Sequence, residues 1–402
     1  MAPIHQKFIP VLLVLAISVS MMATDLYLPA MPLMVDFFSS TDNYIQKSIS
    51  AYQLGLFLSA IVYGPLSDSY GRRNVFLFGF ALFFFSSALL LLAQSTDQLL
   101  WLRLLQGCGG GVSSAISPAI IRDHYAEKQS TKITAQMSIV ILLTPAIAPI
   151  LGGYLTTYFG WRSCFVFIFF IVAFTFFVLL KFFPQRALES SVIAPRVNSL
   201  FKNYKQVLSN KTFFYYALFH SLTSCSLWCY ITVMPFAFIK YMNVSPEIFG
   251  YFVCAQVSAV SLTYMYVQRI VSTKDPTHLM HVGLKLLGLG SFGLIAAAYF
   301  APQSPWIATM CIIPYMIGSP FIFPTSMSRA MSCAGSIKGT ASSCIAASRQ
   351  LFSLLGSLAA AAMPDQTLMP AALFMSATII VMFISLKIAT RNDQASPNPT
   401  PE

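Results

Sequence analysis

The chain has 402 residues, of which 56% are hydrophobic and only 9% are charged, and its formal net charge is +11. A soluble domain carries roughly a quarter charged residues, so this composition excludes a water-facing globular protein and indicates that lipid covers most of the surface. The basic residues stand singly or in small groups between apolar runs, which argues against a nucleic-acid partner despite the positive charge.

Twelve apolar runs follow one another along the chain, each long enough for the roughly 20 residues of a transmembrane helix. Gly, Pro and small residues interrupt them, as transmembrane helices tolerate. No strand-like alternation competes, so we expect an all-α membrane protein. The predicted spans are residues 8–33, 45–66, 75–95, 98–121, 134–158, 162–183, 212–239, 247–271, 278–300, 305–328, 337–362 and 367–388.

The loops between these spans differ in their content of basic residues, which predicts the orientation. Outside loops contain little beyond Lys47, Arg162 and Lys240 if the N-terminus is cytoplasmic. The positive-inside rule then predicts that both termini are cytoplasmic. The inside loops would hold Arg72, Arg73, Arg122, Lys128, Lys132, Arg269, Lys274, Arg329 and Lys338.

The longest connection, residues 184–211, is basic and divides the spans into two groups of six. It predicts an N-terminal half at 1–183 and a C-terminal half at 212–390, joined by a cytoplasmic linker. Residues 197–208 form either a basic amphipathic helix on the anionic inner leaflet or a solvated tether. Two six-helix halves are typical of transporters that rock around a midplane site.

The C-terminal tail at residues 391–402 contains three prolines among polar residues. We expect it to be disordered and cytoplasmic because it has too little apolar surface to bury.

Asp25 is the only carboxylate well inside a predicted span. A charge in hydrocarbon costs ~2.5–3.5 kcal/mol on insertion scales, and burial favours the protonated carboxyl, so a change of surroundings can drive proton uptake and release. Arg103 lies at a similar depth in the fourth span and is the predicted partner. The alternatives are an Asp25 that caps or packs at a break near Pro29, and an Arg103 that snorkels to the outer headgroups.

The stretch from Gly64 to Arg73 is the most specific local pattern. We expect Gly64 to admit a neighbouring helix, Asp68 to pair with an Arg or cap a helix, and Gly71 to permit a tight turn before Arg72 and Arg73. Such a charge cluster can hold one conformation shut and release it on switching. The alternative is a loop that only sets topology.

This stretch resembles the loop signature of the major facilitator superfamily, and two further segments are similar to its drug–proton antiporter branch. Arg103 to Gly109 resembles the fourth-span motif, with Gln106 and Gly107 in place, and Ala148 to Gly153 resembles the end of the fifth-span motif, with Pro149, Gly152 and Gly153. Thr24 to Pro32 is similar to the first span of the Bcr/CflA drug-resistance subfamily.

The chain departs from the family pattern in two places. Thr144, Pro145 and Ala148 stand where the fifth-span motif usually carries Gly ahead of its Gly-Pro pair. The counterpart loop of the second half keeps Arg269 and Asp275 but not the Gly spacing. The resemblance implies the major facilitator fold and a transporter that exports drug-like or metabolite molecules in exchange for protons.

Polar residues within the spans are candidates for a substrate cavity, although each alone is more typical of a hydrogen bond between helices. Arg349 is the second intramembrane cation, and we expect it either to balance an anionic substrate or to bond backbone carbonyls near Pro364. His220 is the only His deep in a span and a candidate proton relay. The cavity candidates are Tyr52, Gln53, Gln136, His220, Tyr230, Gln256 and Arg349, with Gln106 and Tyr315 as further polar positions.

The sequence contains no motif typical of nucleotide hydrolysis or of hydrolytic enzymes. No phosphate-binding loop, protease motif or nucleophile elbow occurs, so we expect no catalytic residues and no cofactor, with the proton gradient as energy source. Cys225 and Cys229 lie one helical turn apart, but nothing nearby completes a metal site. We expect a monomeric multi-pass protein of the inner membrane. A proton-coupled importer is the alternative, and a membrane-embedded receptor or enzyme is a weaker one.

Overall fold

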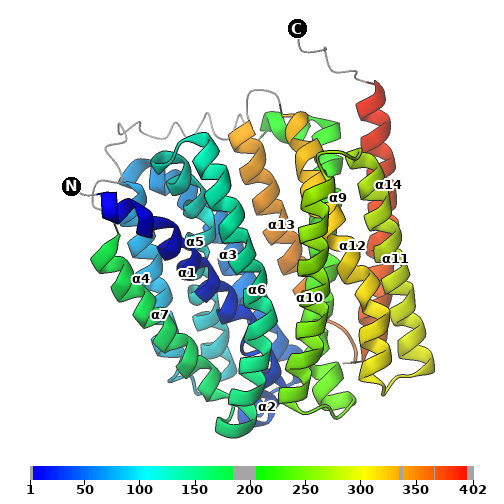
Figure 1. Cartoon of the computed structure of the whole chain (residues 1–402). Helices are drawn as coiled ribbons and strands as arrows, with labels where there is room; N and C mark the ends of the chain where they lie inside the picture. The colour runs from blue at the N-terminus through cyan, green and yellow to red at the C-terminus, as the bar shows by residue number, and fades with distance from the viewer. Residues whose placement is uncertain (1–2, 184–204, 335–337, 366, 396–402) are drawn as a thin grey trace. The chain divides into compact units, whose positions relative to one another are not determined.

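The computed structural model describes residues 3–183, 205–334, 338–365 and 367–395, and every regular element in these ranges is a helix. Twelve helices are long and apolar enough to cross a membrane, which confirms the predicted all-α membrane fold (Figure 1). Observed and predicted spans agree to within a few residues. The largest difference is at the fifth span, which begins at Glu127 instead of residue 134. The orientation of the termini stays a prediction.

The first compact unit consists of Met1–Pro195 together with Met234–Ser258. Helix α5 packs against α3, α4 and α1, while α1 also contacts α6 and α7. The unit contains α1 (Pro3–Asp25), η1 (Leu28–Ala30), α2 (Met31–Phe37), α3 (Asp42–Tyr70), α4 (Arg72–Leu90), α5 (Thr96–His124), α6 (Glu127–Phe159), α7 (Arg162–Phe182), the end of α9, η2 (Phe236–Tyr241) and the first half of α10.

The second compact unit consists of Arg196–Val233 together with Ala259–Glu402. Helix α11 packs against α12 and α14, and α12 also contacts α13. The unit contains most of α9 (Lys211–Pro235), the rest of α10 (Pro246–Ile270), α11 (Pro276–Phe300), α12 (Pro305–Ser332), α13 (Lys338–Ala361) and α14 (Leu368–Ala395). Its largest difference from the predicted C-terminal half is that Met234–Ser258 packs with the first unit.

The predicted linker and tail lie partly outside the described residues. Of residues 184–211, the structure describes 205–211, and residues 205–209 are helical. The tail begins later than predicted, because α14 continues through Ala395. The reason is that Asp393 is held near the end of this helix: its Oδ2 accepts hydrogen bonds from Arg329 and Tyr216.

Helices α3 and α5 approach so closely that only glycine fits where they touch. A Cβ on Gly107 would lie 2.2 Å from the Tyr52 carbonyl oxygen, and one on Gly55 would lie 2.4 Å from the Leu104 carbonyl oxygen. Small residues at such interfaces give transmembrane helices the backbone contact on which their association depends. Gly107 of the predicted fourth-span motif therefore holds α5 against α3.

Candidate functional site

The first span breaks at Asp25. Helix α1 ends at this residue and the chain continues through η1 into α2, with Pro29 and Pro32 supplying no backbone N–H to extend the helix. Ala30 N–H still donates to the Tyr27 carbonyl at 2.9 Å, so the break is a tight 3-10 turn. Asp25 is half-buried at this discontinuity. The break near Pro29 is therefore present, and it presents a carboxylate at the end of a helix within a span.

The break is packed against the fifth span through Gly152. A Cβ at this position would lie 1.8 Å from the Leu26 carbonyl oxygen and 3.2 Å from Pro29 Cγ. No side chain fits there without moving backbone, so Gly152 sets how closely α6 approaches the residues that follow Asp25.

Arg103 of α5 is completely buried beside this break. Its guanidinium carbon lies 4.2 Å from the ring centroid of Tyr27 and 4.4 Å from that of Tyr52. Its Nη1 donates to the Ala23 carbonyl at 2.9 Å and to Gln106 Oε1 at 2.5 Å. Arg103 therefore does not snorkel to headgroups; two aromatic rings and two acceptors hold it in place.

Asp25 and Arg103 are neighbours without being an ion pair. The guanidinium acts electrostatically on the carboxyl group, but no ion pair within 4.0 Å joins them among the described residues. Two guanidinium nitrogens, Nε and Nη2, are buried without a hydrogen-bond partner. A buried cation with unpaired donors is costly, and Asp25 is the carboxyl group on which its charge acts.

Hydrogen bonds fix the groups around Arg103. Gln106 Nε2 donates to Ser87 Oγ at 3.0 Å, which ties α5 to α4. Tyr52 O–H donates to the Ser20 carbonyl at 2.8 Å, which ties α3 to α1. Sequence reasoning singled out Tyr52 and Gln106 but missed the contribution of Tyr27. The only signal for that residue was its place in the segment from Thr24 to Pro32.

The loop after the second span forms an ion-pair cluster around Arg72. Arg72 Nη1 lies 2.9 Å from Asp68 Oδ1, and Nε lies 2.7 Å from Asp123 Oδ2 near the end of α5. Gly71 has φ +88°, the left-handed region that favours glycine, so the predicted tight turn is present. Arg73 Nε donates to the Phe183 carbonyl at 3.3 Å. The loop thereby joins the ends of α4, α5 and α7.

Gly64 does not admit a neighbouring helix. A Cβ there would meet nothing within 4 Å, so that prediction is wrong for this conformation. The glycine instead faces open space beside the ion-pair cluster.

The second unit has a corresponding cluster with the charges exchanged. Asp275 stands before α11 and its Oδ1 lies 2.9 Å from Arg329 Nη2 near the end of α12; Arg329 Nη1 lies 3.5 Å from Asp393 Oδ2. Partial burial opposes ionisation of Asp275, but backbone N–H groups of His278 and Thr277 and the Arg329 charge together hold its pKa below the usual value. Here the acid is in the loop and the base is on the helix.

Glycines of the predicted fifth-span motif lie against two different partners. Gly152 faces the break at Asp25, whereas a Cβ on Gly153 would lie 2.3 Å from the Pro246 carbonyl oxygen at the start of α10. Gly250 of α10 in turn lies against the Pro149 backbone, with a Cβ 2.7 Å from its carbonyl oxygen. The motif therefore makes α6 a close-packed neighbour of both α1 and α10.

The predicted cavity residues have different surroundings within their own units. Tyr52 belongs to the Arg103 cluster, Gln53 is buried on α3 with both amide atoms unpartnered, and Gln136 is exposed on α6. Tyr230 and Gln256 are buried. Tyr315 O–H is bonded to Ser226 and to the Thr223 carbonyl, so it has the expected role of joining helices.

His220 and Arg349 lie together in the second unit. His220 Nδ1 is 3.0 Å from Ser326 Oγ, and the ring packs edge-on against Phe323 with centroids 5.1 Å apart. Arg349 acts electrostatically on His220 and on Tyr264 of α10. Sequence reasoning did not single out Tyr264.

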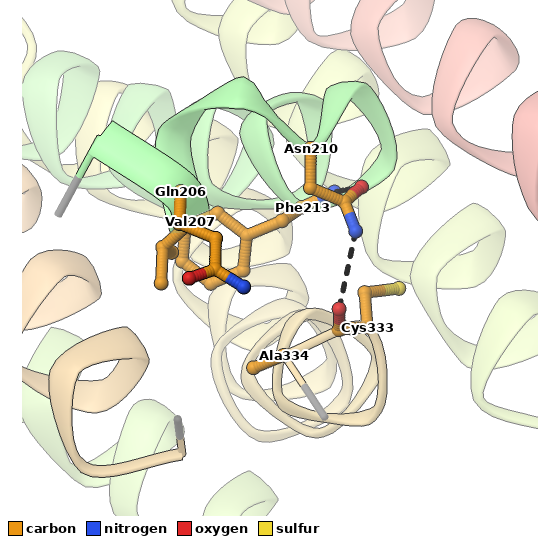
Figure 2. A pocket seen from close by; sticks show the side chains of 6 residues that line it. All are labelled: Gln206, Val207, Asn210, Phe213, Cys333 and Ala334. Atoms are coloured by element: carbon orange, nitrogen blue, oxygen red, sulfur yellow. Dashed lines mark hydrogen bonds between the residues drawn. The ribbon is translucent and has the colours of Figure 1, made fainter. Parts of the chain in front are cut away.

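A small pocket lies near the start of α9 in the second unit, where Asn210 Nδ2 donates to the Cys333 carbonyl at 3.1 Å (Figure 2). Its volume is about 90 Å³, well below the roughly 300–1,000 Å³ of pockets for drug-sized ligands. It is therefore not a substrate site for such molecules. Gln206, Val207, Asn210, Phe213, Cys333 and Ala334 line it.

Comparison with known proteins identifies the family. The Major Facilitator Superfamily profile matches residues 13–357. The chain is 23% identical to a bicyclomycin resistance protein homolog of Haemophilus influenzae over 92% of this chain and 93% of that protein. It is 32% identical to the chloramphenicol resistance protein CraA of Acinetobacter baumannii over 60% of this chain and 58% of CraA. Multidrug resistance protein D of Escherichia coli is 31% identical, over 52% of each chain.

Solved structures show the same fold. The xylose transporter XylE from E. coli, in a partially occluded inward open conformation, matches with a TM-score of 0.72 and 14% identity over 95% of this chain and 97% of that one. An inward-facing bacterial homolog of the human lysosomal transporter Spinster matches with a TM-score of 0.74 and 14% identity over 99% of this chain and all of that one.

Proposed function

Because the chain belongs to the major facilitator superfamily, we propose that it is a proton-driven secondary transporter that exports drug-like or metabolite small molecules by alternating access. Twelve spans and bacterial relatives of this family make it a multi-pass inner-membrane protein. The observation that carries the proposal is the carboxylate at the break of the first span beside the buried, partly unpaired Arg103. We also propose that the protein acts as a monomer, needs no bound cofactor and catalyses no chemical reaction.

The names of the relatives favour export over import. They describe resistance to bicyclomycin, to chloramphenicol and to multiple drugs, and a transporter confers resistance by exporting the compound, whereas import would increase sensitivity. The match spans nearly the whole bicyclomycin-resistance relative but only 58% of CraA and 52% of multidrug resistance protein D. That the chain carries any of these compounds is therefore a proposal.

In the proposed cycle, Asp25 takes up a proton from outside, the protein rearranges, and the proton leaves to the inside. An ionised Asp25 moves toward the unpaired Nε and Nη2 atoms of Arg103; a protonated one is released from them. Each proton that crosses the membrane potential supplies ~2.3 kcal/mol per 100 mV. That energy sustains a roughly fifty-fold substrate gradient.

The test is transport in proteoliposomes with an imposed pH gradient and radiolabelled chloramphenicol as substrate. We expect the wild-type protein to concentrate chloramphenicol and Asp25→Asn to allow only equilibration. Asp36→Asn is the matched control, because Asp36 lies in the same span on α2 and is exposed. Accumulation by Asp25→Asn equal to that of the wild type would show that Asp25 does not carry the proton.

A further inference from the structure

Arg349 stands near the middle of α13, within the span Gly339–Ala361. A cation at the centre of a bilayer is costly, so such residues face a protein interior or a wet cavity. Arg349 is nevertheless exposed. The side of α13 that carries Arg349 therefore faces either lipid or the rest of the protein.

The packing of α13 shows that Arg349 is on the side of this helix that faces the protein. Ile345 and Ser353, one turn before and after Arg349, are buried. Gly356, two turns after Arg349 and on the same face, is so close to α9 that a Cβ would lie 1.9 Å from the Cys225 carbonyl oxygen. Arg349 is therefore on the stripe of α13 that faces α9, and it is the exposed member of that stripe.

No acid among the described residues is paired with Arg349. Among the described residues the Arg349 side chain forms no ion pair and donates no hydrogen bond. The acidic residues described in the second unit are Asp275, Asp365 and Asp393, which lie near helix ends or between helices and not in the middle of a span. This contrasts with Arg103, which two carbonyl acceptors and two rings hold in the first unit.

Two aromatic side chains with polar groups interact electrostatically with Arg349. Tyr264 of α10 is half-buried and close enough to Arg349 for their charges to interact. His220 of α9 is held by Ser326 and also interacts electrostatically with Arg349. Ser348, the neighbour of Arg349, accepts a hydrogen bond from Ser221 Oγ at 3.0 Å, which anchors this part of α13 on α9. Helices α9 and α10 thus bring an imidazole and a phenol within electrostatic range of the Arg349 guanidinium on α13.

We propose that Arg349, together with Tyr264, forms a binding subsite for an acidic group of an amphiphilic substrate, such as a carboxylate, sulfonate or phenolate. The inference rests on the proposed function, since it names a chemical class for the molecules carried. A guanidinium binds a carboxylate through two parallel hydrogen bonds, and the Tyr264 hydroxyl supplies a further donor. An acidic substrate provides the negative charge that the protein itself lacks there.

Binding of two dyes with one ring system tests the subsite without transport. Fluorescein is anionic and rhodamine 123 is cationic, and fluorescence anisotropy of each is titrated with purified protein in nanodiscs at mildly alkaline pH. We expect Arg349→Gln to weaken fluorescein binding about tenfold or more, as loss of a charged hydrogen-bond pair does, and to change rhodamine 123 binding less than about twofold. Arg349→Lys and Tyr264→Phe should weaken fluorescein binding by a smaller factor.

Arg269→Gln is the control for net charge, since it removes an exposed Arg near the end of α10; it should leave both dyes unaffected. Equal loss of both dyes in Arg349→Gln, unchanged fluorescein binding, or a wild-type protein that does not bind fluorescein would overturn the proposal. Arg349→Lys gives the answer if Arg349→Gln does not fold.

Failure of the two proposals is distinguishable. A wild-type protein with Arg349-dependent fluorescein binding but no proton-driven accumulation of chloramphenicol contradicts the transport proposal and leaves the subsite standing. Proton-driven accumulation of chloramphenicol without Arg349-dependent binding of fluorescein contradicts the subsite alone.

Discussion

At the scale of single residues, the shape of the Arg103 side chain matters as much as its charge. A planar guanidinium fills the space between Tyr27 and Tyr52 while Nη1 reaches two acceptors; a lysine ammonium does neither. We expect Arg103→Lys to reduce proton-driven transport at least tenfold although the charge is kept. Initial rates in proteoliposomes measure this.

Arg162→Lys is the matched control. Arg162 also stacks on two rings, those of Phe37 and Trp161, but it lies at the end of a span. It should lose some stability, about 0.5–1 kcal/mol for exposed cation–π contacts, and keep transport. Equal loss of transport in both variants would show that stacking, and not the place beside Asp25, explains the effect.

A second residue-scale prediction concerns pH and Asp275. Because the folded protein holds the Asp275 pKa below its ordinary value of 3.8, the carboxylate stabilises the fold above that pH, and the contribution is lost as pH falls below it. Asp275→Asn keeps a helix-capping side chain and removes only the charge. The variant should melt at a lower temperature than the wild type at neutral pH, and the difference should vanish in acid.

The expected difference is small, up to about 1 kcal/mol, because the Asp275 side chain is 55% exposed. Melting of purified protein in detergent across a pH series measures it. A difference that stays constant into acid would show that Asp275 acts through its cap and not through Arg329.

The sequence predicts some residues of this cluster and not others. Asp25 and Arg103 stand out because a charge within an apolar run is costly and rare. The Tyr27 ring and the Ser87 hydroxyl that complete the cluster do not, since such residues are common in spans and only tertiary packing brings them to Arg103. Gly64 shows the converse: it matches a motif, but a Cβ added there would meet no neighbouring helix.

At the scale of helices, Gly152 is the contact that positions the break in the first span. Gly152→Ala places a methyl group 1.8 Å from the Leu26 carbonyl oxygen, so backbone must move. Overpacking of this kind costs about 1–3 kcal/mol, which exceeds the ~1 kcal/mol that alanine gains over glycine in a helix. We expect a lower melting temperature and a loss of transport, because Leu26 follows Asp25.

Gly288→Ala on α11 is the control, since a Cβ there meets nothing within 4 Å. It should melt at the wild-type temperature or slightly above. If Gly152→Ala melts like Gly288→Ala and transports normally, α6 has room to shift and the break does not depend on this contact.

The sequence predicts helices better than their irregularities. Hydropathy locates the spans because a run of about twenty apolar residues in a bilayer must form a helix to satisfy its backbone hydrogen bonds. It does not show that the first span is interrupted after Asp25, nor that the seventh ends in the π-helix η2. These depend on how Pro29 and Pro235 are accommodated by neighbouring helices, and that information lies elsewhere in the chain.

At the scale of the whole molecule, sequence alone divides the chain at the basic linker into six and six spans. Contacts in the structure divide it differently, because Met234–Ser258 packs with the first unit. Beside the close packing of α6 on α10 at Gly153 and Gly250, three polar contacts hold this segment: Lys240 with Asp42, Glu247 with Thr157, and Tyr251 with Tyr154. Each joins the end of the seventh span or the start of the eighth to the second or fifth span.

These contacts are single hydrogen bonds and one ion pair at the ends of spans, so each is weak enough to break during a cycle. Alternating access requires that two halves separate on one side of the membrane while they close on the other. We infer that the contact between the second and seventh spans opens in each transport cycle. The Lys240 Nζ–Asp42 Oδ1 distance of 2.6 Å offers a place to test this.

In a variant without its eight native cysteines, Asp42→Cys with Lys240→Cys should be joined by a short bis-methanethiosulfonate reagent, because the native side chains meet. We expect the short cross-link to stop transport of chloramphenicol and a reductant to restore it. A long, flexible reagent of the same chemistry should leave most transport intact, since it permits separation; each single-cysteine variant should be unaffected. Undiminished transport with the short cross-link in place would mean that this contact stays closed throughout the cycle.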